Sequence, residues 1–270
     1  MENENRKRIY VTDLGACPRK IQFREVFRIQ EDAIHYETFK GSFVHKLFEV
    51  MGKKSSIDMD RSYWRELWIQ QVYIPNTFRK ALERELPLFE GRIKEFFTKN
   101  KVGKQLFKAQ VSKVEEAMRI PVEKLSWNIN TPQDIQVKYL LSGRPDYRVK
   151  NLILEIKSAK EIRSEHRVQA LAYREIVNKL EPSIRHGFKV LCLGAEKPQL
   201  ESASWRRVLS TFKNKNKLER QLEDAIITRE ALDKDPFNPL IPKRDTGECA
   251  FCSYFAYCSS IKATWKRNKI

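Results

Sequence analysis

No stretch of this sequence is apolar for long enough to cross a bilayer, so a membrane-spanning helix is not expected. The opening residues, MENENRKRIY, lack the apolar core of a secretory signal peptide, and we therefore expect a cytoplasmic protein. A phosphate-binding loop of the form Gly-x4-Gly-Lys-Ser/Thr is missing, which argues against a nucleotide-driven helicase. Internal repeats, low-complexity tracts and RNA-binding signatures are also absent. Strong base specificity is therefore not predicted by any local feature.

Basic residues greatly outnumber acidic ones. Lys and Arg total 52 against 35 Asp and Glu, a formal net charge of +17. Such an excess predicts a polyanionic partner, the alternative being a generically basic soluble protein. The hydrophobic content of 41% is enough for a packed core in a chain of 270 residues. In a reducing compartment, the five cysteines indicate metal ligation rather than disulfides.

The residue pattern changes from helical to β-rich near residue 119. Residues 62–117 are predicted to be helical, with breaks expected at Pro75, Pro87 and Gly103. Short β-rich runs and a helix over 165–178 follow, which predicts an α/β core. The expected strands are 120–127, 135–141, 152–157 and 187–193, and a lysine-rich helix is expected over 204–232.

Two helix starts are predicted upstream. Asp13 and Ser42 are candidate helix caps, because their short polar side chains can accept from the first backbone N–H groups. After Ser42, apolar residues recur at helical spacing at Val44, Leu47, Phe48 and Met51.

An acidic motif lies in the expected strand 152–157. Glu155 and Lys157 share one face of this strand, about 7 Å apart. Asp146, in the run Gly143-Arg-Pro-Asp146, precedes them across a short turn, so neighbouring strands can bring the two carboxylates together. Converging carboxylates bind Mg²⁺ or Mn²⁺, which can activate water and polarise a phosphate. The alternative is an ordinary ion pair on a solvated strand.

Other polar residues can complete this site. His45 lies on an expected helix and can supply a nitrogen ligand, or it is a partly buried helix histidine. Gln169 and Tyr173 are one helical turn apart and can hold the substrate backbone or brace the lysine. Their alternative is an ordinary amphipathic helix.

Four cysteines lie near the two ends of the chain: Cys17, Cys249, Cys252 and Cys258. Four thiolates can hold one metal centre and would tie the two ends together. Their spacing suits both zinc and an iron–sulfur cluster. Cys192 lies in an apolar strand and is expected to be a small buried hydrophobe.

The order of these motifs resembles the RecB-type branch of the PD-(D/E)XK nucleases. With the four cysteines it is similar to the iron–sulfur subset of that branch, which contains the CRISPR-associated RecB-like exonucleases. The resemblance implies an α/β fold with a PD-(D/E)XK (restriction-endonuclease-like) core, a mixed central sheet, a helical insertion and a four-cysteine iron–sulfur subdomain. It implies one nuclease unit over 1–270, with cluster-binding ends at 1–30 and 236–270, a largely helical region at 31–118 and the core at 119–235.

The resemblance also implies roles for individual residues. His45, Asp146 and Glu155 would be ligands of Mg²⁺ or Mn²⁺, and Lys157 would be the catalytic lysine. Gln169 and Tyr173 would support the site and contact DNA. The cysteines Cys17, Cys249, Cys252 and Cys258 would hold a 4Fe–4S cluster. In a CRISPR system, such a nuclease would trim DNA alongside spacer-integration proteins.

Two basic runs are candidates for binding DNA. One joins Trp205, Arg206 and Arg207 to Lys213, Lys215, Lys217 and Arg220, and the other contains Lys262, Trp265, Lys266, Arg267 and Lys269. Interleaved basic and aromatic residues are typical of single-stranded DNA binding, although a solvated helix face has the same composition. The function expected is a metal-dependent exonuclease on single-stranded DNA ends. The alternatives are a catalytically idle DNA-binding subunit and a zinc-stapled interaction module.

Overall fold

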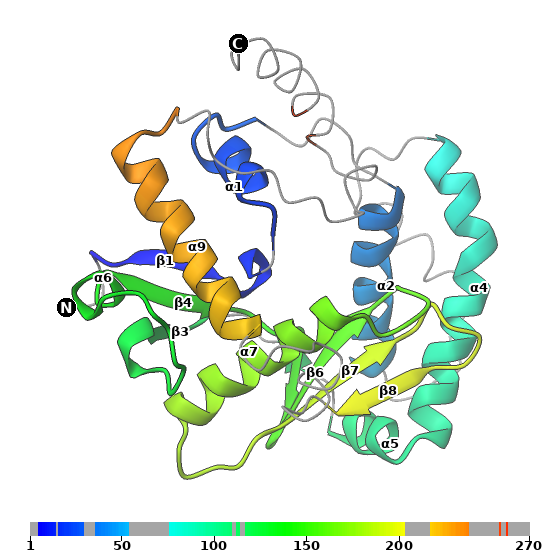
Figure 1. Cartoon of the computed structure of the whole chain (residues 1–270). Helices are drawn as coiled ribbons and strands as arrows, with labels where there is room; N and C mark the ends of the chain where they lie inside the picture. Colours follow the sequence, from blue (N-terminus) through cyan, green and yellow to red (C-terminus); the bar gives the residue numbers. More distant parts are fainter. Residues whose placement is uncertain are drawn as a thin grey trace. The chain divides into compact units, whose positions relative to one another are not determined.

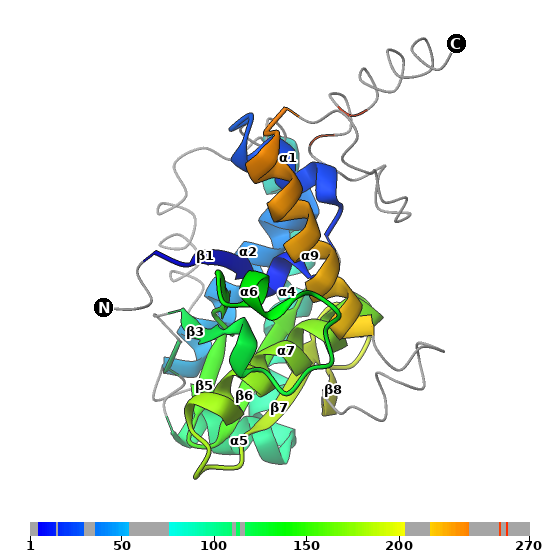
Figure 2. The same ribbon diagram turned by 60° about the vertical axis from the view of Figure 1, so that its left-hand side comes forward.

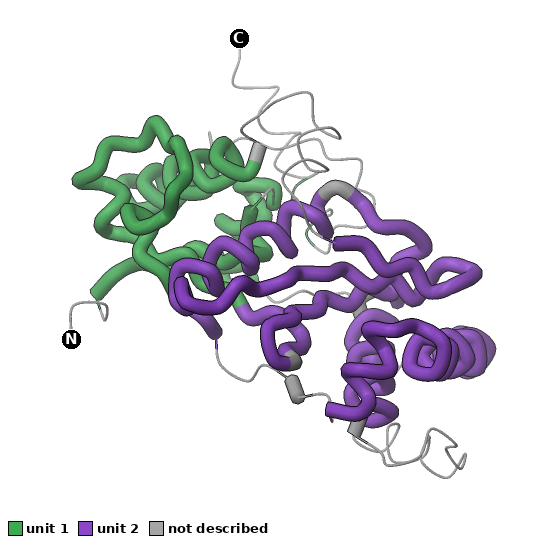
Figure 3. Tube along the Cα trace, turned by 90° about the horizontal axis from the view of Figure 1, so that it is seen from below, with its two compact units in different colours: residues 1–35, 119–143, 212–270 green, residues 36–118, 144–211 purple. Residues whose placement is uncertain are grey.

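Figure 1 shows the computed structural model of the chain. It describes residues 5–14, 16–29, 36–53, 76–109, 112–113, 117–202 and 217–237, with Tyr254 and Cys258. The chain divides into two compact units, each built from separate segments (Figure 3). Unit 1 comprises residues 1–35, 119–143 and 212–270, and unit 2 comprises residues 36–118 and 144–211. The predicted domain ranges stay a prediction.

Unit 2 is built on a mixed sheet of five strands in the order β2-β5-β6-β7-β8. The strands are β2 (Ser112–Lys113), β5 (Tyr147–Val149), β6 (Leu152–Lys157), β7 (Gly187–Cys192) and β8 (Gln199–Ser202). β6 and β7 run parallel and are joined by helix α7 (Ser164–Leu180), while the other neighbours are antiparallel. The predicted mixed sheet, the strand at 152–157 and the helix at 165–178 are therefore confirmed.

Three helices cover one face of this sheet: α2 (Tyr36–Lys53), α4 (Asn76–Lys99) and α5 (Lys101–Lys108). Their apolar sides share one core with Leu154 and Ile156 of β6. The four residues predicted at helical spacing in α2, namely Val44, Leu47, Phe48 and Met51, are all buried in that core. In the views of Figures 1 and 2, α7 lies on the other side of β6 and β7.

Three predicted helix boundaries in unit 2 are wrong. Ser42 is inside α2 rather than at its cap, because the helix already begins at Tyr36. Pro87 lies within α4 and Gly103 within α5, so neither residue interrupts a helix. In α2 and α4 a long apolar face packed on the sheet outweighs the local preference of one residue.

Unit 1 contains a second sheet of three strands in the order β1-β4-β3. β1 (Lys7–Tyr10) pairs in parallel with β4 (Tyr139–Gly143), and the third strand is β3 (Met118–Pro121). The strand predicted over 135–141 begins only at Tyr139, because residues 133–136 form the short helix α6 (Gln133–Gln136) after Pro132. The strand predicted over 120–127 ends at Pro121, where a 3-10 turn follows.

Helices α1 (Pro18–Glu25) and α9 (Lys217–Lys234) contact each other in unit 1 through Ile21 and Leu232. The predicted cap at Asp13 is wrong, because α1 begins after Cys17 with proline in its first turn. Asp13 is buried and instead accepts hydrogen bonds from Arg24 and Arg229. Of the helix predicted over 204–232, residues 204–216 lie outside the described residues. No helix in the described segments is long and apolar enough to cross a membrane.

Candidate active site

The acidic motif lies on the central strand of unit 2. In β6, Leu154 and Ile156 point into the helical core, so the alternation of the strand puts Glu155 and Lys157 on the opposite face. Glu155 is only 3% exposed, and carboxylate side chains are rarely buried to this extent. The predicted face assignment of β6 is therefore confirmed.

Asp146 is brought to Glu155 by the pairing of β5 with β6. Tyr147 lies opposite Leu154 in the antiparallel register, so Asp146, one residue earlier, is next to Glu155. The Ile156 N–H donates to Asp146 Oδ2 over 2.7 Å, which fixes the carboxylate at this strand edge. The turn between the strands contains Lys150 at a φ of 51°. The predicted approach of the two carboxylates is confirmed.

His45 comes to the same place from helix α2. Its Nδ1 lies 3.1 Å from Asp146 Oδ1. Burial lowers the pKa of His45, but the hydrogen bond and negative charge of Asp146 outweigh it, so the net shift is upward. The backbone here is held by Tyr147, whose hydroxyl donates to the His45 carbonyl oxygen over 2.8 Å. Tyr147 is missing from the predicted site, although its position directly after Asp146 in a strand indicates that it faces the helices.

Lys157 is the centre of a hydrogen-bonded row that continues into α7. Its Nζ donates to Glu155 Oε1 over 2.8 Å and to Gln169 Oε1 over 2.9 Å. Gln169 Nε2 in turn donates to the Tyr173 hydroxyl over 3.1 Å. Burial lowers the pKa of Lys157, but Glu155 and Asp146 raise it further, so the ammonium stays charged. The structure thus places Gln169 and Tyr173 as a brace for the lysine, one of the two arrangements predicted.

The second oxygen of Glu155 has no hydrogen-bond partner in the described part of the chain. Glu155 Oε2 is buried and makes no hydrogen bond with any described residue. Burial and then the charge of Asp146 raise the pKa of Glu155, while Lys157 and His45 partly offset them. A buried carboxylate oxygen without a donor, beside a second carboxylate, is costly for the protein alone. A divalent cation would relieve this cost, so the residues present fit one.

The donors are not preassembled as a metal site. Across the described part of the chain, no three His, Cys, Asp or Glu side chains form a group that could hold a metal ion. Instead, His45 faces Asp146, and one oxygen of Glu155 faces Lys157. The assignment of His45, Asp146 and Glu155 as metal ligands stays a prediction.

The cysteines are only partly within the described residues. Cys17 and Cys258 are half-buried and form no disulfide with a described residue, whereas Cys249 and Cys252 lie outside that part of the chain. Tyr254 packs its ring 5.6 Å from that of Phe23 in α1, and Arg19 Nη1 lies 3.9 Å from Cys258 Sγ. In unit 1, residues near the two ends of the sequence are thus in contact, while the four-cysteine centre and its cluster stay a prediction.

Cys192 is separate from this group. It is fully buried in β7, opposite Lys157 in the parallel register, and burial raises the pKa of its thiol to about 11. This confirms the prediction of a buried apolar cysteine.

Most of the predicted DNA-binding residues lie outside the described residues. This applies to Trp205, Arg206, Arg207, Lys213 and Lys215, and to Lys262, Trp265, Lys266, Arg267 and Lys269. Lys217 is the first residue of α9, and Arg220 is exposed on that helix. The basic path for DNA stays a prediction.

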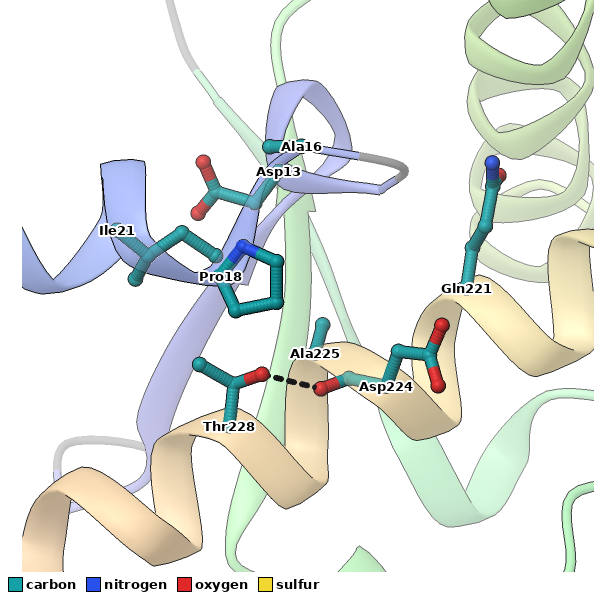
Figure 4. Close-up of a pocket in the computed structure, with 8 residues that line it drawn as sticks. All are labelled: Asp13, Ala16, Pro18, Ile21, Gln221, Asp224, Ala225 and Thr228. Carbon is teal, nitrogen blue, oxygen red and sulfur yellow. Dashed lines mark hydrogen bonds between the residues drawn. The ribbon is translucent and has the colours of Figure 1, made fainter. Parts of the chain in front are cut away.

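Unit 1 also contains a small hollow, drawn in Figure 4. Its lining residues are Asp13, Ala16, Pro18, Ile21, Gln221, Asp224, Ala225 and Thr228. The hollow has no room for a water-sized molecule, and the Thr228 hydroxyl is used within α9, donating to the Asp224 carbonyl oxygen. It contains none of the predicted site residues.

Comparison with known proteins agrees with this geometry. None of the curated proteins matches the sequence. A solved structure described as "Crystal structure of SSO0001" is 17% identical over 96% of this chain and 88% of its own, with a TM-score of 0.41. The family profile described as "PD-(D/E)XK nuclease superfamily" matches residues 11–259, which include every residue of the acidic site. The chain therefore belongs to the PD-(D/E)XK nuclease superfamily.

Proposed function

We propose that this chain is a metal-dependent deoxyribonuclease that removes nucleotides from single-stranded DNA ends. The observation that carries the proposal is the pair of adjacent carboxylates, Asp146 and Glu155, with Lys157 hydrogen-bonded beside them. Nucleases of this superfamily usually use Mg²⁺ or Mn²⁺. An ordinary surface ion pair would not need a buried carboxylate oxygen without a donor, as Glu155 Oε2 is.

His45, Asp146 and Glu155 would hold the cation. When bound, it would supply Lewis-acid stabilisation of the charge that develops on the phosphate and the leaving oxygen. Asp146 is already oriented by the Ile156 N–H, and His45 by the Tyr147 hydroxyl on its carbonyl. These bonds would fix Asp146 and the backbone of His45, while the His45 ring and Glu155 would turn from Asp146 and Lys157 toward the cation.

Lys157 would act as a donor to the substrate rather than as a base. An ammonium has three N–H groups, and Glu155 and Gln169 accept two of them, so one is left for a phosphate oxygen or the attacking water. The charge of the neighbouring carboxylates keeps the lysine protonated. Gln169 and Tyr173 would fix the direction of this remaining N–H. The competing proposal, a catalytically idle DNA-binding subunit, gives no reason for this arrangement.

The choice of substrate rests on charge. A net charge of +17 and two basic runs with tryptophans favour a single strand bound through its phosphates and bases. End-labelled linear single-stranded, double-stranded and circular single-stranded DNA should be incubated with Mg²⁺, Mn²⁺ or a chelator. We expect nucleotide release from linear single strands only when metal is present. Cleavage of the circle would make the enzyme an endonuclease, and cleavage in chelator would overturn the metal requirement.

We further propose that Cys17, Cys249, Cys252 and Cys258 hold a structural 4Fe–4S cluster, with zinc as the alternative. Support comes from the contacts that Cys258 and Tyr254 make with α1 in unit 1. Anaerobically purified protein should contain iron and sulfide, Cys17→Ser should bleach it, and the buried Cys192→Ser should not. Stoichiometric zinc without iron would overturn the cluster while leaving the nuclease proposal intact.

The resemblance to CRISPR-associated exonucleases extends the proposal to a pathway. In it, the enzyme would trim DNA before insertion as new spacers and would bind spacer-integration proteins. Co-purification with such proteins from the native host, and loss of correctly sized spacers in a Lys157→Ala strain, would support this role. Normal spacer lengths in that strain would contradict it.

A further inference from the structure

A histidine at the start of α7 is held in one defined state. His166 is the third helical residue of α7, and its Nδ1 accepts a hydrogen bond from the Arg163 N–H over 3.2 Å. A ring nitrogen that accepts this bond carries no proton, so in the neutral ring the proton is on Nε2. His166 lies three and seven residues before Gln169 and Tyr173, on the helix face that carries the brace of Lys157.

The ring is neutral and its free N–H is accessible. Burial and then the positive charge of Lys157 lower the pKa of His166 to about 4, with Arg163 and Arg167 adding to this and Glu165 opposing it. Nε2 makes no hydrogen bond with any described residue, and it is not fully buried. The N–H therefore faces solvent in a region of positive potential next to the catalytic lysine.

We propose that His166 is a substrate-binding residue whose Nε2–H donates to a non-bridging oxygen of a DNA phosphate next to the scissile one. This inference rests on the proposed nuclease function. The partially positive start of α7 and the ammonium of Lys157 both favour an anion at this place. The usual residue for the same capping bond is glutamate or glutamine, and a glutamate would put a negative charge where the phosphate binds. The histidine closes the cap and keeps a donor toward the strand.

Three variants separate this role from simple helix capping. His166→Gln and His166→Glu both keep an acceptor for the Arg163 N–H, but only glutamine keeps a donor for the phosphate. His166→Ala removes both groups. If His166 only caps the helix, the folded His166→Ala protein should bind DNA as tightly as His166→Gln, because alanine lacks the donor but adds no charge that could repel DNA.

The measurements are thermal unfolding, kinetics with Mg²⁺, and binding of a labelled single strand in Ca²⁺ to separate binding from cleavage. We expect His166→Gln and His166→Glu to unfold at similar temperatures. The glutamate variant should show a KM and a dissociation constant higher by about ten-fold or more, because hydrogen bonds to charged groups are the stronger ones. The kcat should change less than KM in both.

A modified substrate locates the contact. When the phosphate next to the cut is replaced by an uncharged methylphosphonate, the difference between the glutamate and glutamine variants should shrink. Equal binding by these two variants on ordinary DNA would overturn the inference. If the protein binds DNA but never cuts it, the proposed function fails, yet the same binding comparison still decides the role of His166. If the protein binds no DNA, both are wrong.

Discussion

At the scale of single residues, the site depends on Lys157 more than on any other side chain. Its Nζ joins Glu155 on the same strand to Gln169 on α7, so it fixes the position of one acidic residue and one polar residue together. Its neighbours keep it charged, which suits a donor to a phosphate. Both properties follow from the position of the Lys157 ammonium between two acceptors.

Replacing Lys157 with alanine should lower kcat by about 10² or more, the usual contribution of one positioned catalytic group. Affinity for Mn²⁺ should be retained, because the lysine is not a proposed ligand. The matched control is Lys189→Ala on the adjacent strand β7, where Nζ bonds Ser202 Oγ over 2.9 Å. Cleavage rates measured under single-turnover conditions decide the matter, and an active Lys157→Ala protein would remove the lysine from the mechanism.

At the scale of elements, the positions of the ligands depend on how α2 and α7 are attached to the sheet of unit 2. Tyr147 on β5 bonds the His45 carbonyl of α2 and packs its ring 5.1 Å from that of Phe48. At the end of α7, Glu181 is bonded by Arg148 of β5 over 2.7 and 2.5 Å. Each attachment joins a helix to the strand that follows Asp146.

Tyr147→Phe should raise the metal concentration needed for half-maximal cleavage, because α2 loses the hydrogen bond that holds the His45 backbone in position. A lost buried hydrogen bond should also cost about 1 kcal/mol of stability. Tyr139→Phe in unit 1 is the control, since it loses a tyrosine hydrogen bond, to the carboxylate of Glu230, outside the site. We expect Tyr139→Phe to lose at least as much stability, because its acceptor is charged, but a changed metal requirement only for Tyr147→Phe. A shared metal requirement would make Tyr147 purely structural.

The attachment at Glu181 predicts a pH dependence of stability. Hydrogen bonds from Arg148 lower the pKa of Glu181 in the folded protein. A lowered folded pKa stabilises the fold above the unfolded value, about 4.3, and this contribution is lost as the pH falls through the folded pKa. The unfolding temperatures of wild type and Glu181→Gln should therefore differ at pH 7 and converge near pH 3. A difference that is constant with pH would exclude the ion pair as its cause.

The sequence predicts those elements whose pattern is local. The alternation in β6 assigns Glu155 and Leu154 to opposite faces, and the spacing in α2 identifies its buried side. It does not predict the bond from Tyr147 to His45, because 102 residues separate them and only tertiary packing brings them together. Nor does it predict that α2 extends back past Ser42, since the stabilisation comes from helices packed on the same sheet.

At the scale of the whole molecule, the dominant property is charge. A net charge of +17 creates a field that attracts nucleic acid whatever its sequence. The two units share one chain that crosses between them several times, so neither is a continuous segment. Binding that depends mainly on phosphates should be weakly selective and strongly sensitive to salt.

Affinity for single-stranded DNA should therefore fall steeply with salt, with a slope of log affinity against log salt of about −0.7 for each neutralised phosphate. Replacing Arg206, Arg207, Lys213 and Lys217 together should flatten the slope, as measured by fluorescence anisotropy. Four lysines of the helical block, Lys80, Lys99, Lys101 and Lys104, provide a control of equal charge. If the control flattens the slope as much, the strand does not follow the predicted basic run.

The most direct test of the nuclease assignment is Glu155→Gln. The substitution keeps the shape and an acceptor for Lys157 but removes a buried negative charge that lies beside Asp146 and has one oxygen without a partner. We predict that metal-free Glu155→Gln unfolds at the same temperature as wild type or above it, while metal-dependent cleavage falls by at least about 10². A variant that is clearly less stable and still cuts DNA at the wild-type rate would show that Glu155 is a structural residue and would contradict the account.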